Sequence, residues 1–169
     1  MDLALIVLLS VLPILVIAAG LNDLTTMTIP NWISLALMIG FVPAAFAVGL
    51  PLGLIALHFG VALAALFVGA GLFAMRLLGG GDAKLMAAVC LWLGTGGALA
   101  FVLMTAVAGG LFCLGLLMVR ATPGIAGLGG PAWMGRLLQS KGHIPYGITL
   151  AAGAMAAFSS NHIVRTVVG

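Results

Sequence analysis

Two aspartates, Asp23 and Asp82, are the residues of this sequence best suited to catalysis. The chain has 169 residues but only three acidic ones, and the third, Asp2, stands near its start. A carboxylate inside a bilayer costs about 2.5 to 3.5 kcal/mol on insertion scales. A chain so poor in acids has little structural reason to keep two of them among apolar segments, so we treat both as candidates for function.

A pair of carboxyl groups can hydrolyse a peptide bond without further help. When two such groups lie within a few ångströms of each other, they share one proton. The ionised group removes a proton from a water molecule, and the protonated group polarises the peptide carbonyl. We therefore predict an aspartic endopeptidase with Asp23 and Asp82 as its catalytic pair, and we expect neither a cofactor nor a metal.

Each aspartate also has a purely structural interpretation. Aspartate is a favoured N-cap, and Asp82 fits that role for a helix beginning at Ala83. Asp23 lies in a polar stretch with Asn22 and three threonines, which is typical of a turn at the membrane interface. Two other functions stay open: a proton-coupled transporter, which would hold its carboxylates near the membrane midplane, and a noncatalytic membrane subunit of a pilus or secretion machine.

The composition indicates an integral membrane protein that positions these aspartates on helices. Hydrophobic residues make up 64% of the chain and charged residues 5%, which is far outside the range of soluble domains. We predict an all-α fold of about six transmembrane helices in a single membrane-embedded domain, residues 1–169. The expected spans are Leu3–Gly20, Ile33–Val48, Leu52–Leu78, Ala83–Leu93, Ala98–Val119 and one that starts near Ile144.

Two further features refine this prediction. Residues 85–119 form an apolar run too long for one span, so we expect the chain to fold back at Gly94–Gly97. The polar stretch before the last span is expected to hold an interfacial helix at Trp133–Gln139.

The basic residues predict the orientation of the chain in the membrane. Cytoplasmic loops carry an excess of Lys and Arg. Arg76 and Lys84 lie in the third connection, and Arg120, Arg136 and Lys141 lie in the fifth. The N-terminus is therefore predicted outside and both aspartates on the cytoplasmic side. Because the basic residues are scattered, we expect no nucleic-acid partner.

The cysteines and the one histidine inside a predicted span are interpreted as structural residues. Cys90 and Cys113 stand singly in apolar runs, without the spacing of a disulfide framework or a zinc site, so we interpret them as packing residues. His58 has no ligating partner nearby in the sequence. It is predicted to be a packed or hydrogen-bonded core residue.

Three patches resemble the type IV prepilin peptidases, membrane aspartyl proteases with a Gly-x-Gly-Asp signature. "GGGDAKLMA" resembles the second aspartate motif of that family and contains Gly79, Gly80, Gly81, Asp82 and Lys84. "NDLTTMTIPNWIS" resembles the first motif and contains Asp23, Ile29, Pro30 and Asn31. "HIPYGITLAAG" is similar to the stretch that opens the last helix of the family and contains Pro145, Tyr146 and Gly147.

The resemblance implies an activity, a substrate and a location. A prepilin peptidase of the bacterial inner (cytoplasmic) membrane removes the short basic leader of a prepilin or pseudopilin at the cytoplasmic face, in contact with membrane lipid and with pilus-assembly machinery. The similarity points to the short form found with Flp-type, tight-adherence pili. Since the chain opens directly into its first span and lacks a CxxC motif, we predict peptidase activity without methyltransferase activity.

The resemblance also suggests roles for individual residues. The three glycines before Asp82 are expected to permit an unwound backbone that a substrate can approach closely. Candidate substrate-positioning residues are Pro30, Asn31, Lys84, Pro145, Tyr146 and Gly147. Lys84 is equally a positive-inside residue, and Tyr146 is equally a membrane-interface anchor. One departure concerns leader recognition: where family members often carry basic residues, this chain has Thr25, Thr26, Met27 and Thr28.

Overall fold

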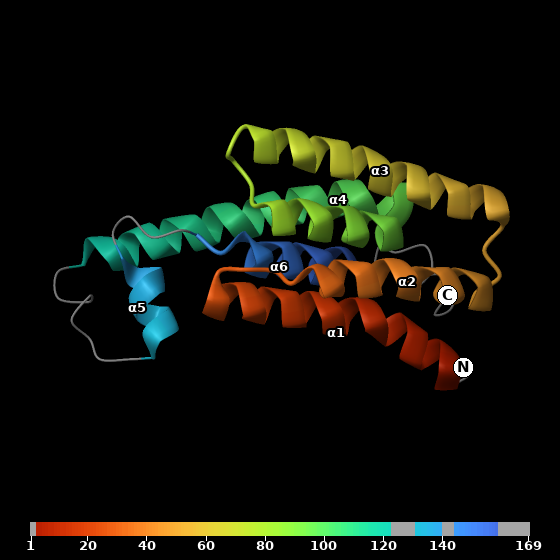
Figure 1. The fold of residues 1–169 in the computed structure, drawn as a ribbon, viewed down its shortest axis with the longest axis horizontal. Helices are drawn as coiled ribbons and strands as arrows, with labels where there is room; N and C mark the ends of the chain where they lie inside the picture. The colour runs from red at the N-terminus through yellow and green to blue at the C-terminus, as the bar shows by residue number, and fades with distance from the viewer. Residues whose placement is uncertain (1–2, 123–130, 140–143, 159–169) are drawn as a thin grey trace.

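The structure, a computed structural model, describes residues 3–122, 131–139 and 144–158 and is all-helical over these ranges. Its helices are α1 (Leu3–Thr26), α2 (Asn31–Ala47), α3 (Leu52–Ala74), α4 (Gly80–Ala121), α5 (Ala132–Leu138) and α6 (Tyr146–Phe158) (Figure 1). The prediction of an all-α fold is confirmed. Within these described ranges, three segments are long and apolar enough to cross a membrane, namely Ile6–Thr26, Leu52–Ala74 and Gly80–Ala121, which supports the assignment as a membrane protein.

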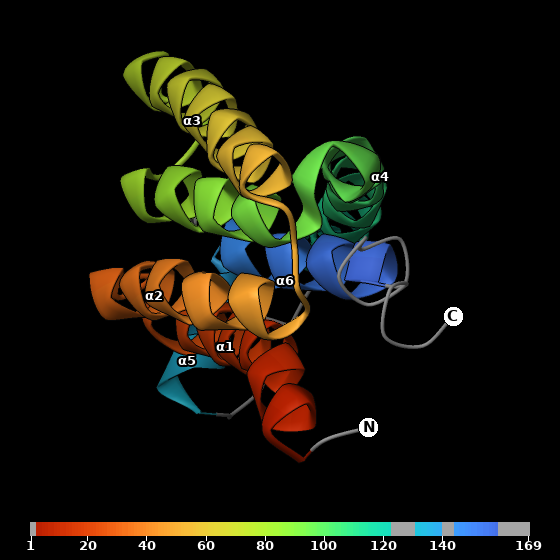
Figure 2. The same cartoon turned by 90° about the vertical axis from the view of Figure 1, so that its right-hand side faces the viewer.

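The helices form a bundle in which α4 and α6 are central. The end-on view shows α3 on one side of this centre and α1 with α2 on the other (Figure 2). The short helix α5 lies across one end of the bundle, where Nη2 of Arg136 donates a hydrogen bond to the carbonyl of Thr25. The predicted helix at Trp133–Gln139 is thus present as α5. Lys141, one of the basic residues used to predict the orientation, lies outside the described residues.

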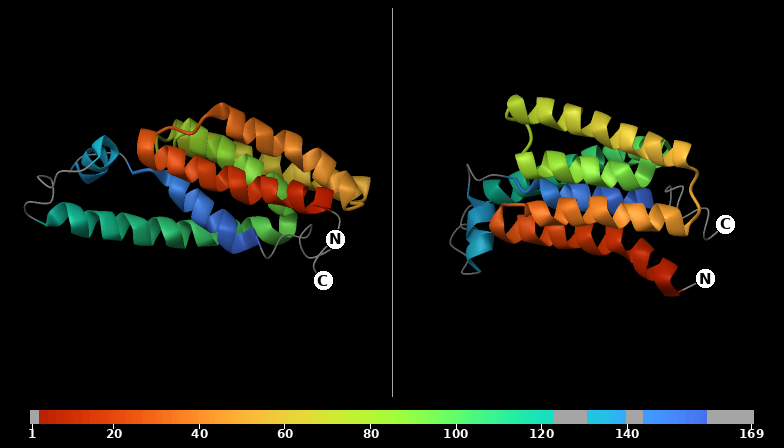
Figure 3. Two further views of the ribbon diagram at one scale, coloured as in Figure 1. Left: turned by 90° about the horizontal axis from the view of Figure 1, so that it is seen from below. Right: turned by 45° about the vertical axis from the view of Figure 1, so that its right-hand side comes forward.

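Helix α4 changes direction at Gly94, as the sequence predicts for this region. Gly94 has φ 58° and ψ −162°, which interrupts the helical geometry. Two views show that the chain reverses there and that the second part of α4 runs back along the bundle (Figures 1 and 3). Only glycine adopts these dihedral angles at low cost. A Cβ atom at Gly94 would also lie 2.5 Å from Nε2 of His58.

Replacing this glycine should destabilise the fold. We expect Gly94→Ala to lower the free energy of unfolding by about 3 kcal/mol, because the alanine would combine backbone strain with overpacking against His58. Thermal unfolding in detergent measures the effect. The matched control is Gly60→Ala in α3, whose added Cβ would meet no atom within 4 Å. Equal unfolding temperatures for the two variants would contradict this account of the reversal.

The core around the reversal contains buried aromatic side chains. Trp92 is fully buried, and its indole nitrogen donates a 2.9 Å hydrogen bond to the carbonyl of Leu37. The ring of Phe41 stacks on His58 with a centroid distance of 5.4 Å. Nδ1 of His58 lies 2.7 Å from the carbonyl oxygen of Leu91 and therefore donates to it, since a carbonyl only accepts. His58 is the packed, hydrogen-bonded residue that the sequence predicts.

The structure corrects the predicted end of the first helix. Helix α1 continues to Thr26 instead of ending at Gly20, so Asp23 lies in the last turn of a helix rather than in the connection after it. The hydroxyl of Thr25 donates to the carbonyl of Leu21, and that of Thr26 donates to the carbonyl of Asn22. Both hydroxyls therefore bond to carbonyl groups of their own helix, so these polar side chains do not require a turn at this point in the chain.

The boundaries around Asp82 also differ from the prediction. Helix α3 ends at Ala74 rather than Leu78, and α4 begins at Gly80 rather than Ala83. The N-cap residue is Gly79, so the alternative interpretation of Asp82 as the N-cap of this helix is wrong. Asp82 is instead the third residue of α4, where its carboxylate accepts a hydrogen bond from the backbone N–H of Gly79. This bond stabilises the start of α4 at Gly80, three residues before the predicted start at Ala83.

Candidate active site

Asp23 joins the end of α1 to the start of α6. The residue is buried, with 6% of its surface exposed. Its Oδ2 accepts a 2.7 Å hydrogen bond from the backbone N–H of Gly147. That N–H belongs to the first turn of α6, where backbone donors have no partner within the helix and favour a negative charge. Two segments 124 residues apart are thereby held together at one carboxylate.

Asp82 lies in the first turn of α4 and is buried to a similar degree, with 8% of its surface exposed. Its Oδ2 accepts the 3.1 Å hydrogen bond from Gly79. Its Oδ1 is buried and has no hydrogen-bond partner among the described residues. One oxygen therefore holds the side chain in place, and the other makes no hydrogen bond within the described residues.

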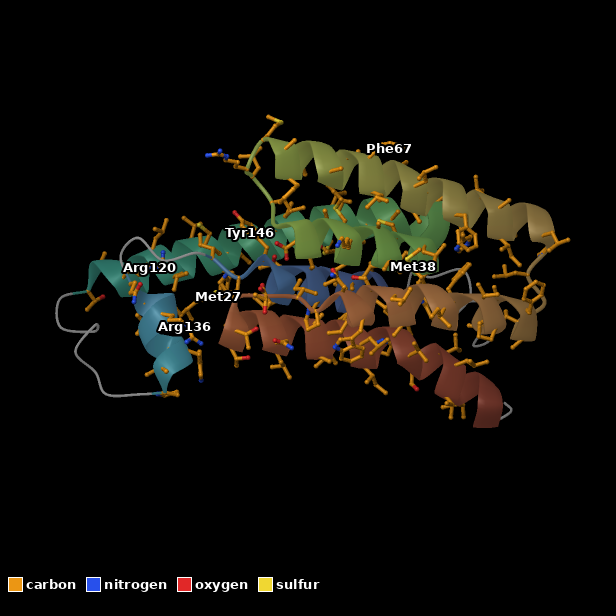
Figure 4. All side chains as sticks on the ribbon, in the orientation of Figure 1. Met27, Met38, Phe67, Arg120, Arg136 and Tyr146 are labelled. Atoms are coloured by element: carbon orange, nitrogen blue, oxygen red, sulfur yellow. The ribbon has the colours of Figure 1, made fainter. Side chains whose placement is uncertain are left out.

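Both aspartates line one cavity of about 720 Å³. The cavity lies between the end of α1, the α3–α4 connection and the start of α6. Met27 and Tyr146 also line it, and both are found at the end of the bundle that carries α5 (Figure 4). The tertiary structure thus brings together the two acids that the sequence singled out.

Two glycines leave room for the carboxylates. A Cβ atom at Gly79 would lie 2.7 Å from Oδ2 of Asp82, and one at Gly147 would lie 2.7 Å from Cβ of Asp23. Any larger residue at either position would displace an aspartate. The expected unwound backbone is present only at Gly79, whose ψ is 150°, because Gly80 and Gly81 already belong to the first turn of α4.

The candidate positioning residues divide into two groups. Pro145 and Tyr146 line the cavity with the aspartates, and Gly147 bonds directly to Asp23. Asn31 and Lys84 lie elsewhere: Nζ of Lys84 donates a 3.0 Å hydrogen bond to Oδ1 of Asn31, and both line a separate groove between α2, α3 and α4.

Pro30 does not line the aspartate cavity either. It is the N-cap residue of α2, with φ −63° and ψ 135°. Its fixed φ suits the extended backbone that leads into a helix.

The separation of Lys84 from the cavity leads to a specific expectation. Lys84→Ala removes one exposed hydrogen bond, which is worth about 1 kcal/mol or less. We expect this variant to process substrate within about threefold of the wild-type rate, because Lys84 does not reach the aspartates. The measurement is the initial rate of the leader cleavage that the sequence resemblance implies. A much larger loss in a folded variant would instead place the ammonium group in contact with substrate.

Among the cavity residues that the sequence analysis did not name as site components, two have unusual backbone angles. Met27 and Arg76 have positive φ values of 58° and 60°. Met27 directly follows α1, and Arg76 is the second residue after α3. This left-handed position usually holds glycine or asparagine, and a non-glycine residue there is strained. Both residues line the aspartate cavity. No pattern in the sequence marks such a position when it holds Met or Arg.

The comparison with protein families is consistent with this geometry. Residues 10–114 match the type IV leader peptidase family, and the chain belongs to that family. The match includes Asp23, Asp82 and the glycines before Asp82. Comparison with curated proteins gave no match, and comparison with solved structures gave none either.

Proposed function

We propose that this protein is a membrane aspartic endopeptidase that removes the short basic leader from prepilins or pseudopilins, with Asp23 and Asp82 as its catalytic pair. One observation carries the proposal. Two buried carboxylates from different helices line the same cavity, and each has one oxygen bound by a backbone N–H. Membership of the type IV leader peptidase family supports the reaction class.

The geometry is compatible with general acid and base catalysis by the pair. One ionised carboxylate removes a proton from water, whose oxygen attacks the carbonyl carbon of the scissile peptide bond. The protonated partner donates to the carbonyl oxygen as the tetrahedral intermediate forms. Collapse of the intermediate breaks the C–N bond, and the amine leaves with a proton from the pair. Oδ1 of Asp82 is buried without a partner among the described residues, and we propose that it forms one of these contacts once substrate and water occupy the cavity.

We further propose that the protein lies in the bacterial inner membrane, and that the end of the bundle with the aspartates faces the cytoplasm. Arg76 and Lys84 lie beside the start of α4, near Asp82. Arg120 and Arg136 are found at the same end of the bundle (Figure 4). Their accumulation at one end is the positive-inside pattern. The start of α1 lies at the opposite end (Figure 1), which supports an external N-terminus.

Other parts of the proposal concern the type of peptidase. We propose that α1, α2, α3, α6 and the two parts of α4 act as six membrane spans of a single peptidase domain, residues 1–169. Among the described residues, three segments are long and apolar enough to span a membrane. We propose the short, Flp-associated form, without methyltransferase activity, acting near membrane lipid and pilus-assembly machinery.

The geometry also bears on the competing functions. A proton-coupled transporter predicts carboxylates near the midplane of the bundle, whereas Asp23 lies in the last turn of α1 and Asp82 in the first turn of α4. A noncatalytic subunit predicts no substrate-sized cavity at the two acids, yet they share one of about 720 Å³. Both observations favour the peptidase.

The direct test is cleavage of a Flp-type prepilin that is reconstituted with the purified protein in lipid vesicles. We expect a shift in prepilin mobility and a new N-terminus at the end of the leader, identified by mass spectrometry. A prepilin with a substituted cleavage site serves as the control and should stay intact. If the purified, folded protein leaves several such prepilins uncut, the proposed activity is wrong.

A further inference from the structure

A second, apolar groove adjoins the aspartate cavity. It has a volume of about 390 Å³ and is bounded by the end of α3, both parts of α4 and the start of α6. Leu78 and Tyr146 line the groove and the aspartate cavity alike. The two spaces are therefore neighbours that meet at these two side chains.

One face of α4 forms the floor of this groove. Val102, Ala106, Gly110 and Cys113 line it at intervals of four, four and three residues, which is the spacing of one helix face. Val102 is 48% exposed, and Ala106 and Gly110 are exposed as well. The groove is thus open along its side, where a second helix has access from the lipid.

The residue sizes suit a helix as the occupant. Helices in lipid gain little from the hydrophobic effect when they associate, so they depend on close packing over small residues. Ala106 and Gly110 form a small-xxx-small pair on the groove face. A Cβ atom at Gly110 would meet no atom within 4 Å, so nothing in the described part of the chain fills the space above it.

We propose that this groove binds the apolar helix that follows the scissile bond of the substrate. The inference rests on the proposed function, in which the cleaved bond lies directly before that helix. A substrate with its scissile bond at Asp82 must continue from the aspartate cavity, and the groove begins there, at Leu78 and Tyr146. The polar leader then occupies the cavity with the acids, and the first turns of the apolar helix pack on α4.

Filling the groove should impair cleavage. We expect Gly110→Leu to lower kcat/KM for prepilin by about 10- to 100-fold, because the displaced helix moves the scissile bond away from the aspartates. Gly115→Leu is the matched control: it lies on the same helix outside the groove, and its Cβ is equally free of neighbours. The control should stay within about twofold of wild type. Equal effects of the two substitutions would overturn the proposal.

Cross-linking tests binding apart from cleavage. Cys113 lines the groove, whereas Cys90 is buried at 2% exposure. The Asp82→Asn variant is mixed in vesicles with a prepilin that carries one introduced cysteine, scanned along its apolar helix, and a mild oxidant is added. We expect a disulfide to Cys113 that is absent from the Cys113→Ser variant. Gly115→Cys in the Cys113→Ser background should give none.

The two proposals fail in different ways. If wild-type protein leaves the prepilin uncut but Cys113 cross-links to its helix, the peptidase proposal fails and the groove proposal stands. If wild-type protein cuts the prepilin and no position of the helix cross-links to Cys113, the groove proposal is overturned. The groove would then hold only lipid chains.

Discussion

Asp23→Asn and Asp82→Asn should each abolish leader cleavage, with a loss of about 1,000-fold or more. General acid and base groups typically contribute 10²- to 10⁴-fold each. An asparagine has nearly the shape of aspartate and keeps an acceptor for the N–H of Gly147 or Gly79. It cannot carry the shared proton. The reaction should therefore stop while the helix contacts made by each side chain are preserved.

The controls for this prediction separate chemistry from folding. The yield and unfolding temperature of both variants should match those of the wild type. Because the two carboxylates act as a unit, the double variant should be no slower than either single one. If folded Asp82→Asn cleaved normally, Asp82 would have only a structural role, as the acceptor for the N–H of Gly79 at the start of α4. If Asp23→Asn did so, the pair would be refuted.

Gly147→Ala should have the second-largest effect on activity, a loss of about 100-fold. The added Cβ would lie 2.7 Å from Cβ of Asp23 and 2.9 Å from Oδ2 of Asp23. Helix α6 must then move away from α1, or the carboxylate must turn out of its bond to the backbone. Either change separates Asp23 from Asp82, and kcat should fall more than KM rises. Initial rates over a range of prepilin concentrations measure both constants.

A matched substitution checks that the loss is local. Gly53→Ala, in the first turn of α3, adds the same methyl group where no atom lies within 4 Å. It should leave activity and unfolding temperature near the wild-type values. Full activity in a folded Gly147→Ala protein would show that the Asp23–Gly147 hydrogen bond has no part in placing the carboxylate.

The contacts of Asp23 and Asp82 also explain why two acids are stable in so apolar a protein. A buried carboxylate without partners is very costly. Here each carboxylate accepts a hydrogen bond from a backbone N–H at the start of a helix, where the helix dipole favours negative charge. The same N–H groups stabilise the acids and hold them at the shared cavity. Stability and the proposed chemistry therefore depend on the same contacts.

The sequence was informative wherever the physics is local. Long apolar runs predicted helices, because only a helix satisfies its own backbone within lipid. The cluster of glycines after Leu93 predicted the reversal found at Gly94, and isolation in an apolar run predicted a packed His58. The scarcity of acids singled out Asp23 and Asp82. Boundaries were less certain: α1 continues to Thr26, and α4 begins at Gly80, where the bond from Gly79 to Asp82 stabilises its start.

Only the tertiary structure decided which residues meet. It joins Asp23 to Gly147 and places both acids at one cavity, while it pairs Lys84 with Asn31 outside that cavity. It also gives Met27 and Arg76 their strained positions and leaves the groove above Gly110 open. The physical reason lies in the composition. Because these helices are apolar on all sides, their sequences carry little signal for which face meets protein and which meets lipid.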